Sequence, residues 1–412
     1  MRELAFTPPS RKVIAGIAAV FISLFLINAS VQGPSVHELV SSATSPLSFP
    51  SFFSGSSGSS QDGELEKIAI VMVMFGLGSA QEGQHMVKSI LMRASRPVDI
   101  HIVCSADAMT FLQSRLDLVK RPAHDVYVQF YVVGADMIKE RAKRAGTGSI
   151  YHAGPGGLVK MFLHEIVLIP QAVYVDTDAF FAVDPYILWS YLTNMTSTTE
   201  ILIAFPHAGP TVSGPSLICS CVMAMNFEEM RNQWFMPSTL VPGTEKTGLA
   251  NLETYAMQKM NPKEPPYGDQ GILYAVWRRF PERFWRLSRA WDITGCQGGQ
   301  FYSMGLAGEA VGADAISLEA ESKSQKLGSE KDDAIEGAIF PGIIHYNCMG
   351  GEESVFEMQK LMVRHDWGPM LLSVVRYKWV WLNTGTATLR THVVQENEIR
   401  FYDELHAATL RK

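Results

Sequence analysis

The sequence has little cysteine, no excess of basic residues and no internal repeat, and these deficits exclude several classes of protein. Lys and Arg number 35 against 41 Asp and Glu, which gives a formal net charge of −6 and argues against a nucleic-acid binder. Five scattered cysteines are too few for a disulfide framework, and an odd number leaves at least one unpaired, although the pairing itself stays open. Because no CxxC pair is present, a structural zinc site is not expected.

The N-terminal region contains the one long apolar run, residues 13–31 (VIAGIAAVFISLFLINASV), which follows Arg11 and Lys12. As a helix with a rise of about 1.5 Å per residue, this run spans roughly 28 Å, close to the thickness of a bilayer core. The basic flank predicts that residues 1–12 form a cytosolic tail and that the rest of the chain is lumenal.

A cleaved signal peptide is the open alternative for this run, because Ala29 and Ser30 would suit a cleavage site. Either reading sends the chain into the secretory pathway, where Asn194-Met195-Thr196 is a candidate N-glycan acceptor. Residues 32–66 read as a flexible stem, since ten of the twenty positions in 41–60 are serine. Tail, anchor, stem and a domain at 67–412 are the layout of a single-pass type II membrane protein of the Golgi or the endoplasmic reticulum.

Apolar runs alternate with amphipathic stretches from Lys67 onward, which predicts an α/β fold with a Rossmann-like, mostly parallel central sheet flanked by helices. The expected strands are 68–75, 98–104, 126–133 and 172–175, and the expected helices are 80–95, 106–118 and 157–169. We interpret residues 236–268 and 305–337 as insertions and expect the segment after Glu353 to be helical. A basic cluster is interpreted as a solvated helix face; it consists of Lys139, Arg141, Lys143 and Arg144. Ligands of such sheets bind at the carboxyl ends of the strands.

The clearest chemical signal is Asp176-Thr177-Asp178, which directly follows the apolar run 172–175. Residues i and i+2 at a strand end point the same way, so Asp176 and Asp178 converge and repel each other. A divalent cation removes that repulsion and neutralises a diphosphate leaving group. The alternative is a structural role, in which the two aspartates lie in a turn and cap the next helix.

Two further motifs carry polar side chains at element ends. Gly268-Asp269-Gln270-Gly271 precedes an apolar helix, so Asp269 and Gln270 are candidates for binding sugar hydroxyls, with a helix N-cap at Asp269 as the alternative. His345 ends the apolar run Ile343-Ile344 and, with Asp176 and Asp178, makes an O,O,N set that suits Mn²⁺ better than Ca²⁺. Taken alone, such a histidine is more often structural.

The order of these motifs resembles glycosyltransferase family 8, most closely glucoside and xyloside xylosyltransferases and more distantly glycogenin. The resemblance runs from about Ile68 to about Gly350. Its motifs are Lys160 in GLVKMFLHEIVLIP, YVDTDAFF at 173–181, SCVMAMN at 220–226, GDQGIL at 268–273, Trp291-Asp292 and His345-Tyr346.

The resemblance implies a GT-A fold, Mn²⁺, a UDP-sugar donor and a glycan or glycoprotein acceptor, with the anomeric configuration retained. By position, Asp176, Asp178 and His345 would hold the metal. Lys160 and the motif Asp176-Thr177-Asp178 would bind the nucleotide diphosphate and its cation, while Asp269 and Gln270 would act at the donor sugar. Xylose or glucose is the expected sugar.

The sequence departs from the family pattern at two places. Cys219-Ser220-Cys221 replaces Asn-Ser-Gly, and Gly351 stands where a phosphate-binding lysine is expected. A non-catalytic lumenal lectin or scaffold is therefore one alternative. A haloacid-dehalogenase-type phosphatase is another, although Phe180 replaces the Thr or Val that normally follows its D-x-D pair. The oligomeric state is not predicted.

Overall fold

The computed structural model describes residues 65–147, 154–198, 200–207, 213–294, 342–346, 373–396 and 398–411. All of them belong to one unit, Glu64–Lys412. The expected membrane anchor, the stem up to residue 64 and the insertion 305–337 lie outside these residues. Within the described part of the chain, no helix combines the length and the apolar character needed to cross a membrane.

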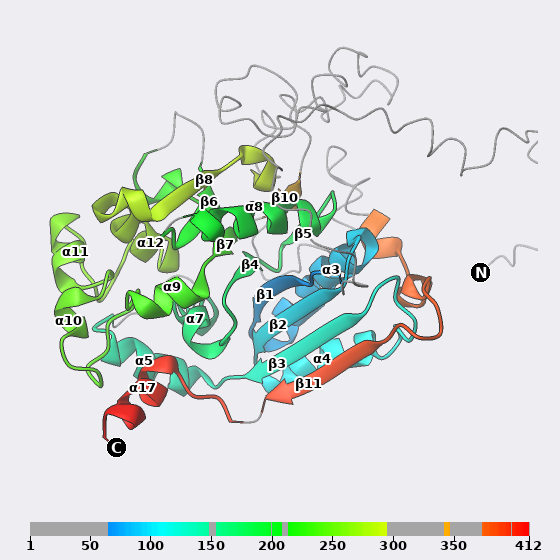
Figure 1. Cartoon of the computed structure of the whole chain (residues 1–412), viewed down its shortest axis with the longest axis horizontal. Coiled ribbons are helices and arrows are strands. Elements are labelled where there is room, and N and C mark those ends of the chain that lie inside the picture. The colour runs from blue at the N-terminus through cyan, green and yellow to red at the C-terminus, as the bar shows by residue number, and fades with distance from the viewer. Residues whose placement is uncertain are drawn as a thin grey trace, which may run out of the picture. The chain divides into compact units, whose positions relative to one another are not determined.

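An eight-stranded sheet forms the centre of this unit (Figure 1). In spatial order its strands are β11 (Thr391–Glu396), β3 (Val126–Val132), β2 (Val98–Cys104), β1 (Ile68–Met74), β4 (Ala172–Val175), β7 (Val222–Met225), β6 (Ile203–Pro206) and β8 (Phe284–Leu287). Only β7 runs against the other seven described strands. The expected mostly parallel sheet is thus confirmed.

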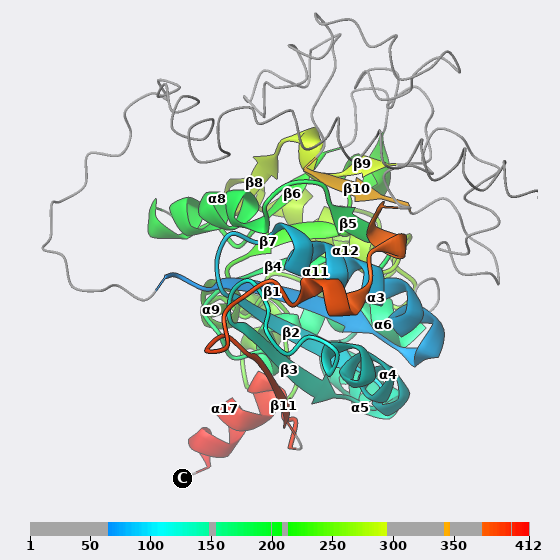
Figure 2. The ribbon, with the colours of Figure 1, turned by 90° about the vertical axis from the view of Figure 1, so that its right-hand side faces the viewer.

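Helices lie on both sides of the sheet, and in Figure 2 α8 is on its left while α3 and α4 are on its right. The described α-helices are α3 (Gly76–Arg93), α4 (Ala106–Leu116), α5 (Ala135–Arg144), α6 (Gly154–Val159), α7 (Leu163–Ile166), α8 (Pro185–Thr198), α9 (Phe227–Asn232), α10 (Thr244–Thr247), α11 (Leu252–Met257), α12 (Asp269–Arg279) and α17 (Tyr402–Leu410). Short 3₁₀ turns are η1 (Lys160–Phe162), η2 (Gly214–Leu217), η3 (Pro281–Arg283), η4 (Arg289–Trp291) and η7 (Trp379–Leu382).

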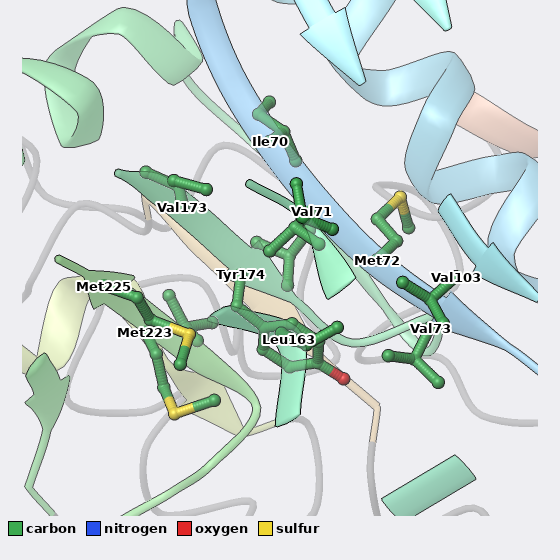
Figure 3. Close-up of a cluster of buried hydrophobic side chains, with 14 of the residues drawn as sticks. Ile70, Val71, Met72, Val73, Val103, Leu163, Val173, Tyr174, Met223 and Met225 are labelled. Atoms are coloured by element: carbon green, nitrogen blue, oxygen red, sulfur yellow. The ribbon is translucent and has the colours of Figure 1, made fainter. Parts of the chain in front are cut away.

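Coverage on both faces explains the continuous apolar sequences of the central strands. Every residue of β1, β4 and β7 is buried. Figure 3 shows Val71 of β1, Tyr174 of β4 and Met223 of β7 in one cluster of side chains. A strand with two covered faces has no solvent-facing position, so it lacks the alternation that marks a half-exposed strand.

A second, three-stranded sheet consists of β5 (Ala179–Phe181), β10 (Ile343–His345) and β9 (Ile293–Thr294). Strand β10 pairs antiparallel with β5 and parallel with β9. Because β5 begins directly after Asp178, this small sheet brings residues 343–345 to the carboxyl end of β4.

Several expected elements differ in the structure. In place of the expected helix at 157–169, the structure has α6, η1 and α7. The first turn of α6 is Gly154-Pro155-Gly156-Gly157, a poor helix-forming sequence. The expected insertion 236–268 contains the short helices α10 and α11.

The expectation of a wholly helical segment after Glu353 is wrong at β11, which pairs in parallel with β3 at the edge of the sheet. Three of the six residues of β11 are exposed and the other three are only partly buried, so Thr391–Glu396 (THVVQE) carries only a weak apolar pattern. Residues 353–372 lie outside the described part of the chain.

The basic cluster on α5 is also not a uniformly solvated face. Lys139 and Lys143 are exposed, but Arg141 is completely buried, and its guanidinium pairs with Glu165 of α7 (Nη2–Oε1 2.6 Å) and with Asp403 of α17 (Nε–Oδ2 3.3 Å). Arg144 pairs with the same Asp403 (Nε–Oδ2 2.8 Å). These ion pairs attach the C-terminal helix α17 to α5 and α7.

Asp403 accepts hydrogen bonds from Arg144 and from the Ser238 hydroxyl (Oγ–Oδ2 2.7 Å) and is fully buried. Burial alone would raise the pKa of this carboxyl, but the Arg144 hydrogen bond and the charge of Arg141 lower it below its usual value. The carboxylate is therefore the ionised centre of the cluster.

Replacing this carboxylate should destabilise the protein strongly. We expect Asp403→Asn to lower the free energy of unfolding by about 3 kcal/mol, because the buried Arg141 and the partly buried Arg144 lose their shared counter-ion. Denaturant unfolding of the purified chain measures the change.

The matched control is Asp136→Asn, whose exposed pair with Lys139 (3.1 Å) should contribute less than about 0.5 kcal/mol. Equal effects of the two substitutions would contradict the role assigned to the buried cluster.

Candidate active site

The site lies where the order of the central strands reverses. From β1 the chain moves outward through β2 to β3, and it then returns to β4 on the other side of β1. In α/β sheets, a crevice forms at the carboxyl ends of two neighbouring strands whose connections run in opposite directions. Ligands bind in this crevice. The Asp176-Thr177-Asp178 motif follows β4 at this position.

Backbone hydrogen bonds hold both aspartates of the motif. The Asp176 amide donates to the carbonyl oxygen of Cys221, just before β7 (2.8 Å). The Tyr346 amide, just after β10, donates to the carbonyl oxygen of Asp178 (2.8 Å). The motif thus connects the large and the small sheet, and these bonds fix its backbone from both sides.

His345 reaches the acidic motif from β10 and is buried. Its Nε2 lies 3.1 Å from Oδ1 of Asp178, and its Nδ1 lies 3.0 Å from Oδ1 of Asp292. One ligand atom from each of Asp176, Asp178 and His345 lies within 4.8 Å of the other two. The three residues predicted to bind metal are therefore together in the structure.

Charge interactions within this group determine its protonation. Burial alone would lower the pKa of His345, but attraction to Asp178 raises it well above the usual value. Burial alone would raise the pKa of Asp178, and His345 lowers it. Burial raises the pKa of Asp176, and repulsion from Asp178 adds to this effect. The two carboxylates are thus in unlike environments.

This donor set fits a divalent cation such as Mn²⁺. Two carboxylates and an imidazole are oxygen and nitrogen ligands of intermediate hardness. The Asp292 carboxylate accepts from Nδ1 of His345, an arrangement that directs Nε2 toward the metal in carboxylate–histidine pairs. For His345 to act as a ligand, Nε2 must first lose its proton.

Lys160, from the 3₁₀ turn between α6 and α7, supplies the positive charge beside Asp176. Its ammonium nitrogen lies 2.8 Å from Oδ1 of Asp176 and 3.5 Å from Oδ2 of Asp269. Burial alone would lower the pKa of Lys160, but these two carboxylates raise it well above the usual value. The Tyr174 hydroxyl also donates a hydrogen bond to Asp176.

Asp269 faces this cluster from the first turn of α12. It accepts a hydrogen bond from the Ser220 hydroxyl (Oγ–Oδ2 2.7 Å) and is buried. The residue at the N-cap of α12 is Gly268, so the alternative reading of Asp269 as the N-cap is wrong. The side chain of Gln270 instead donates to the carbonyl oxygen of Pro215 (2.8 Å), in the turn η2.

The backbone requires glycine on both sides of the Asp269–Gln270 pair. Gly268 has φ of 59°, in the left-handed region that favours glycine. A Cβ on Gly271 would lie 1.8 Å from the carbonyl oxygen of Pro266, so no side chain fits there. The motif therefore combines a tight helix entry with the placement of Asp269.

Three neighbours of the site received no role from sequence reasoning. Glu82 of α3 accepts a hydrogen bond from the Thr177 hydroxyl (3.1 Å), and burial together with repulsion from Asp178 raises its pKa to about 7. Asp292, noted only within a motif, holds His345. Glu82 has no motif of its own, since it is one polar residue within an 18-residue helix.

The third neighbour is the pair Cys219 and Cys221, which form a disulfide. Sequence reasoning left cysteine pairing open and treated the two residues only as departures from Asn-Ser-Gly. Cys104 is free and buried. Residues 296 and 348, the other two cysteines, lie outside the described part of the chain.

The acidic motif lies where the strand order of an α/β sheet reverses, and a histidine and a lysine contact it. This arrangement makes it a candidate site for a divalent cation and an anionic ligand. No protein-family model matches the sequence. The human xylosyl- and glucuronyltransferase LARGE2 is 28% identical over 138 residues, which are 33% of this chain and 18% of that protein. The chain thus matches less than a fifth of the length of that relative.

Solved structures with a similar fold include mouse xyloside xylosyltransferase 1 (14% identity, TM-score 0.45, 69% of this chain and 99% of that one). They also include galactosyltransferase LgtC with donor and acceptor sugar analogues (12%, 0.43, 77% and 97%). A third is the Streptococcus pneumoniae glycosyltransferase GlyE (15%, 0.42, 77% and 62%). Each of these four proteins is named as a glycosyltransferase, the class of enzyme that the sequence motifs resemble.

The position of Lys160 predicts a change in metal affinity. We expect Lys160→Met to tighten Mn²⁺ binding roughly tenfold, about 1.4 kcal/mol, because a buried positive charge no longer neutralises Asp176. Isothermal titration of the nucleotide-free protein with Mn²⁺ measures the effect, and Lys139→Met, at an exposed lysine, is the control. Weaker binding by Lys160→Met would show instead that the ammonium positions Asp176 for the metal.

Proposed function

We propose that the chain is a retaining glycosyltransferase that moves a sugar from a UDP-sugar to a glycan or glycoprotein acceptor and depends on Mn²⁺. The observation that carries this proposal is the convergence of Asp176, Asp178 and His345, with Lys160 beside them, at the carboxyl end of β4. Two carboxylates, an imidazole and an ammonium would together recognise a cation and the diphosphate bound to it.

In this proposal Asp176, Asp178 and His345 hold the cation, which neutralises the charge of the departing diphosphate. Lys160 lies between Asp176 and Asp269, so its ammonium can turn from these carboxylates to a phosphate oxygen. Such preorganised positive charge stabilises the leaving group where charge develops.

Asp269 is the proposed contact for donor-sugar hydroxyls. The Ser220 hydroxyl and Lys160 fix its carboxylate next to the proposed diphosphate site. Gln270 is proposed to lie near the anomeric carbon, which requires its side chain to leave the carbonyl of Pro215 when donor binds. With no carboxylate assigned as a nucleophile, the enzyme would act mainly by positioning the acceptor on the face that UDP leaves.

Xylose or glucose is the proposed donor sugar, from the resemblance to xylosyltransferases. We further propose a single-pass type II protein of the Golgi or endoplasmic reticulum, anchored by residues 13–31, with residues 67–412 in the lumen. The N-terminal apolar run with its basic flank and the serine-rich stem support this arrangement.

A second candidate function is a non-catalytic lumenal lectin or scaffold. The disulfide between Cys219 and Cys221 favours it, because this cross-link occupies the place of the family's Asn-Ser-Gly segment. Cys219 has no amide with which to hold a donor sugar. A scaffold would bind a nucleotide or a sugar without turnover.

A panel of UDP-sugars distinguishes the two functions. The purified chain is incubated with each donor and Mn²⁺, with and without a chelator, and released UDP is measured. We expect release from one donor, with UDP-xylose and UDP-glucose as the leading candidates, and its loss when the chelator removes the metal. Binding of UDP with Mn²⁺ but no release, even with a set of glycan acceptors, would favour the scaffold.

If Asp178 is a metal ligand, its replacement should slow sugar transfer. Asp178→Asn should lower the rate of sugar transfer about 10³-fold, equivalent to roughly 4 kcal/mol of barrier, because one metal ligand is lost. The surface substitution Asp136→Asn should leave the rate unchanged. Full activity of Asp178→Asn would refute the assignment of Asp178 as a ligand.

A further inference from the structure

The disulfide between Cys219 and Cys221 lies within the polar network of the site. The carbonyl of Cys221 accepts the amide hydrogen of Asp176, and Ser220 between the two cysteines donates its hydroxyl to Asp269. On the other side, Sγ of Cys219 lies 3.9 Å from Nδ1 of His345. The disulfide thus lies directly beside the acidic motif.

These two sulfurs belong to a second cluster of metal-ligating side chains. One ligand atom from each of Cys219, Cys221, Asp292 and His345 lies within 4.8 Å of the other three. The Asp292 carboxylate and the His345 imidazole are already in contact, at 3.0 Å. Three elements meet here: the segment before β7, the segment before β9, and β10.

The oxidation state of the sulfurs decides what this cluster can bind. As a disulfide, the sulfurs carry no negative charge and are poor ligands. As thiolates, they are soft ligands, and two thiolates with an imidazole and a carboxylate make a four-coordinate set of the kind that Zn²⁺ takes in proteins. Reduction would therefore change which metal ions the cluster can bind.

We propose that reduction of the Cys219–Cys221 disulfide creates a zinc site whose ligands are Cys219, Cys221, Asp292 and His345. The electrons come from a dithiol reductant. One of its thiolates attacks a disulfide sulfur, and its second thiol closes the reductant to a disulfide. Both protein sulfurs are left as thiols, and they release their protons when the metal binds.

Burial indicates which sulfur is attacked. Cys219 is half-buried, whereas Cys221 is 1% exposed. The reductant therefore reaches Sγ of Cys219, and Cys221 leaves as the first thiolate. Both cysteines then face His345 and Asp292 from the segment before β7.

The proposed zinc site shares His345 with the Asp176–Asp178 site. Nδ1 of this imidazole faces Cys219 and Asp292, and Nε2 faces Asp178. A cation bound at Nδ1 would replace the hydrogen bond from Nδ1 to Asp292, so the two sites would be coupled through one ring. The zinc site itself does not depend on the proposed transferase function.

The test uses Co²⁺ as a spectroscopic probe in place of Zn²⁺. The full chain carries Cys104→Ala, Cys296→Ala and Cys348→Ala, so that only the 219–221 pair can supply thiolates. It is titrated with Co²⁺ before and after reduction by a phosphine, which becomes a phosphine oxide and leaves both thiols. Near-ultraviolet circular dichroism follows the fold of the reduced protein.

We expect a thiolate-to-cobalt charge-transfer band in the reduced protein that is absent from the oxidised one. The band should disappear on Zn²⁺ addition and be lost in Cys219→Ser and in His345→Ala. A folded reduced protein without the band would overturn the proposal. So would a band that persists in either variant, or loss of the fold on reduction, because the site needs the fold to assemble its ligands.

Discussion

The repulsion between Asp176 and Asp178 is the constraint on which the rest of the site depends. Two carboxylates two residues apart at a strand end cannot both stay ionised without positive charge nearby. Lys160 meets the first and His345 meets the second. Because each partner comes from a distant part of the chain, the site exists only when α6–α7, β4 and β10 are all in place, and a divalent cation would serve the same purpose.

The two sheets supply this arrangement. The parallel order of β2, β1 and β4 places the acidic motif where strand connections part, and the small sheet returns residues 343–345 to the same point. A Cβ on Gly342, just before β10, would lie 2.5 Å from the ring of Trp291, so the approach of β10 to η4 requires glycine. That packing also sets Asp292, the next residue after Trp291, beside His345.

The fold was predictable where apolar runs were long. Strands β1, β2, β3 and β4 appear within one residue of their expected bounds. Strands β1 and β4 are buried throughout and have continuous apolar sequence, while β2 and β3 are still rich in buried β-branched and aromatic residues. The edge strand β11 was missed, since half of its residues face solvent. The metal-ligand candidates were found from their position after strands, but Asp292, Glu82 and the disulfide act through tertiary contacts that no local spacing encodes.

We propose that the acidic motif binds a nucleotide diphosphate through a cation. Calorimetric titration of the protein with UDP, with Mn²⁺ present and again after metal has been removed, measures this binding. We expect UDP to bind with Mn²⁺ and to lose at least about tenfold in affinity without it. Equal UDP affinity in both conditions, or no UDP binding in either, would show that the motif does not bind the diphosphate through a cation.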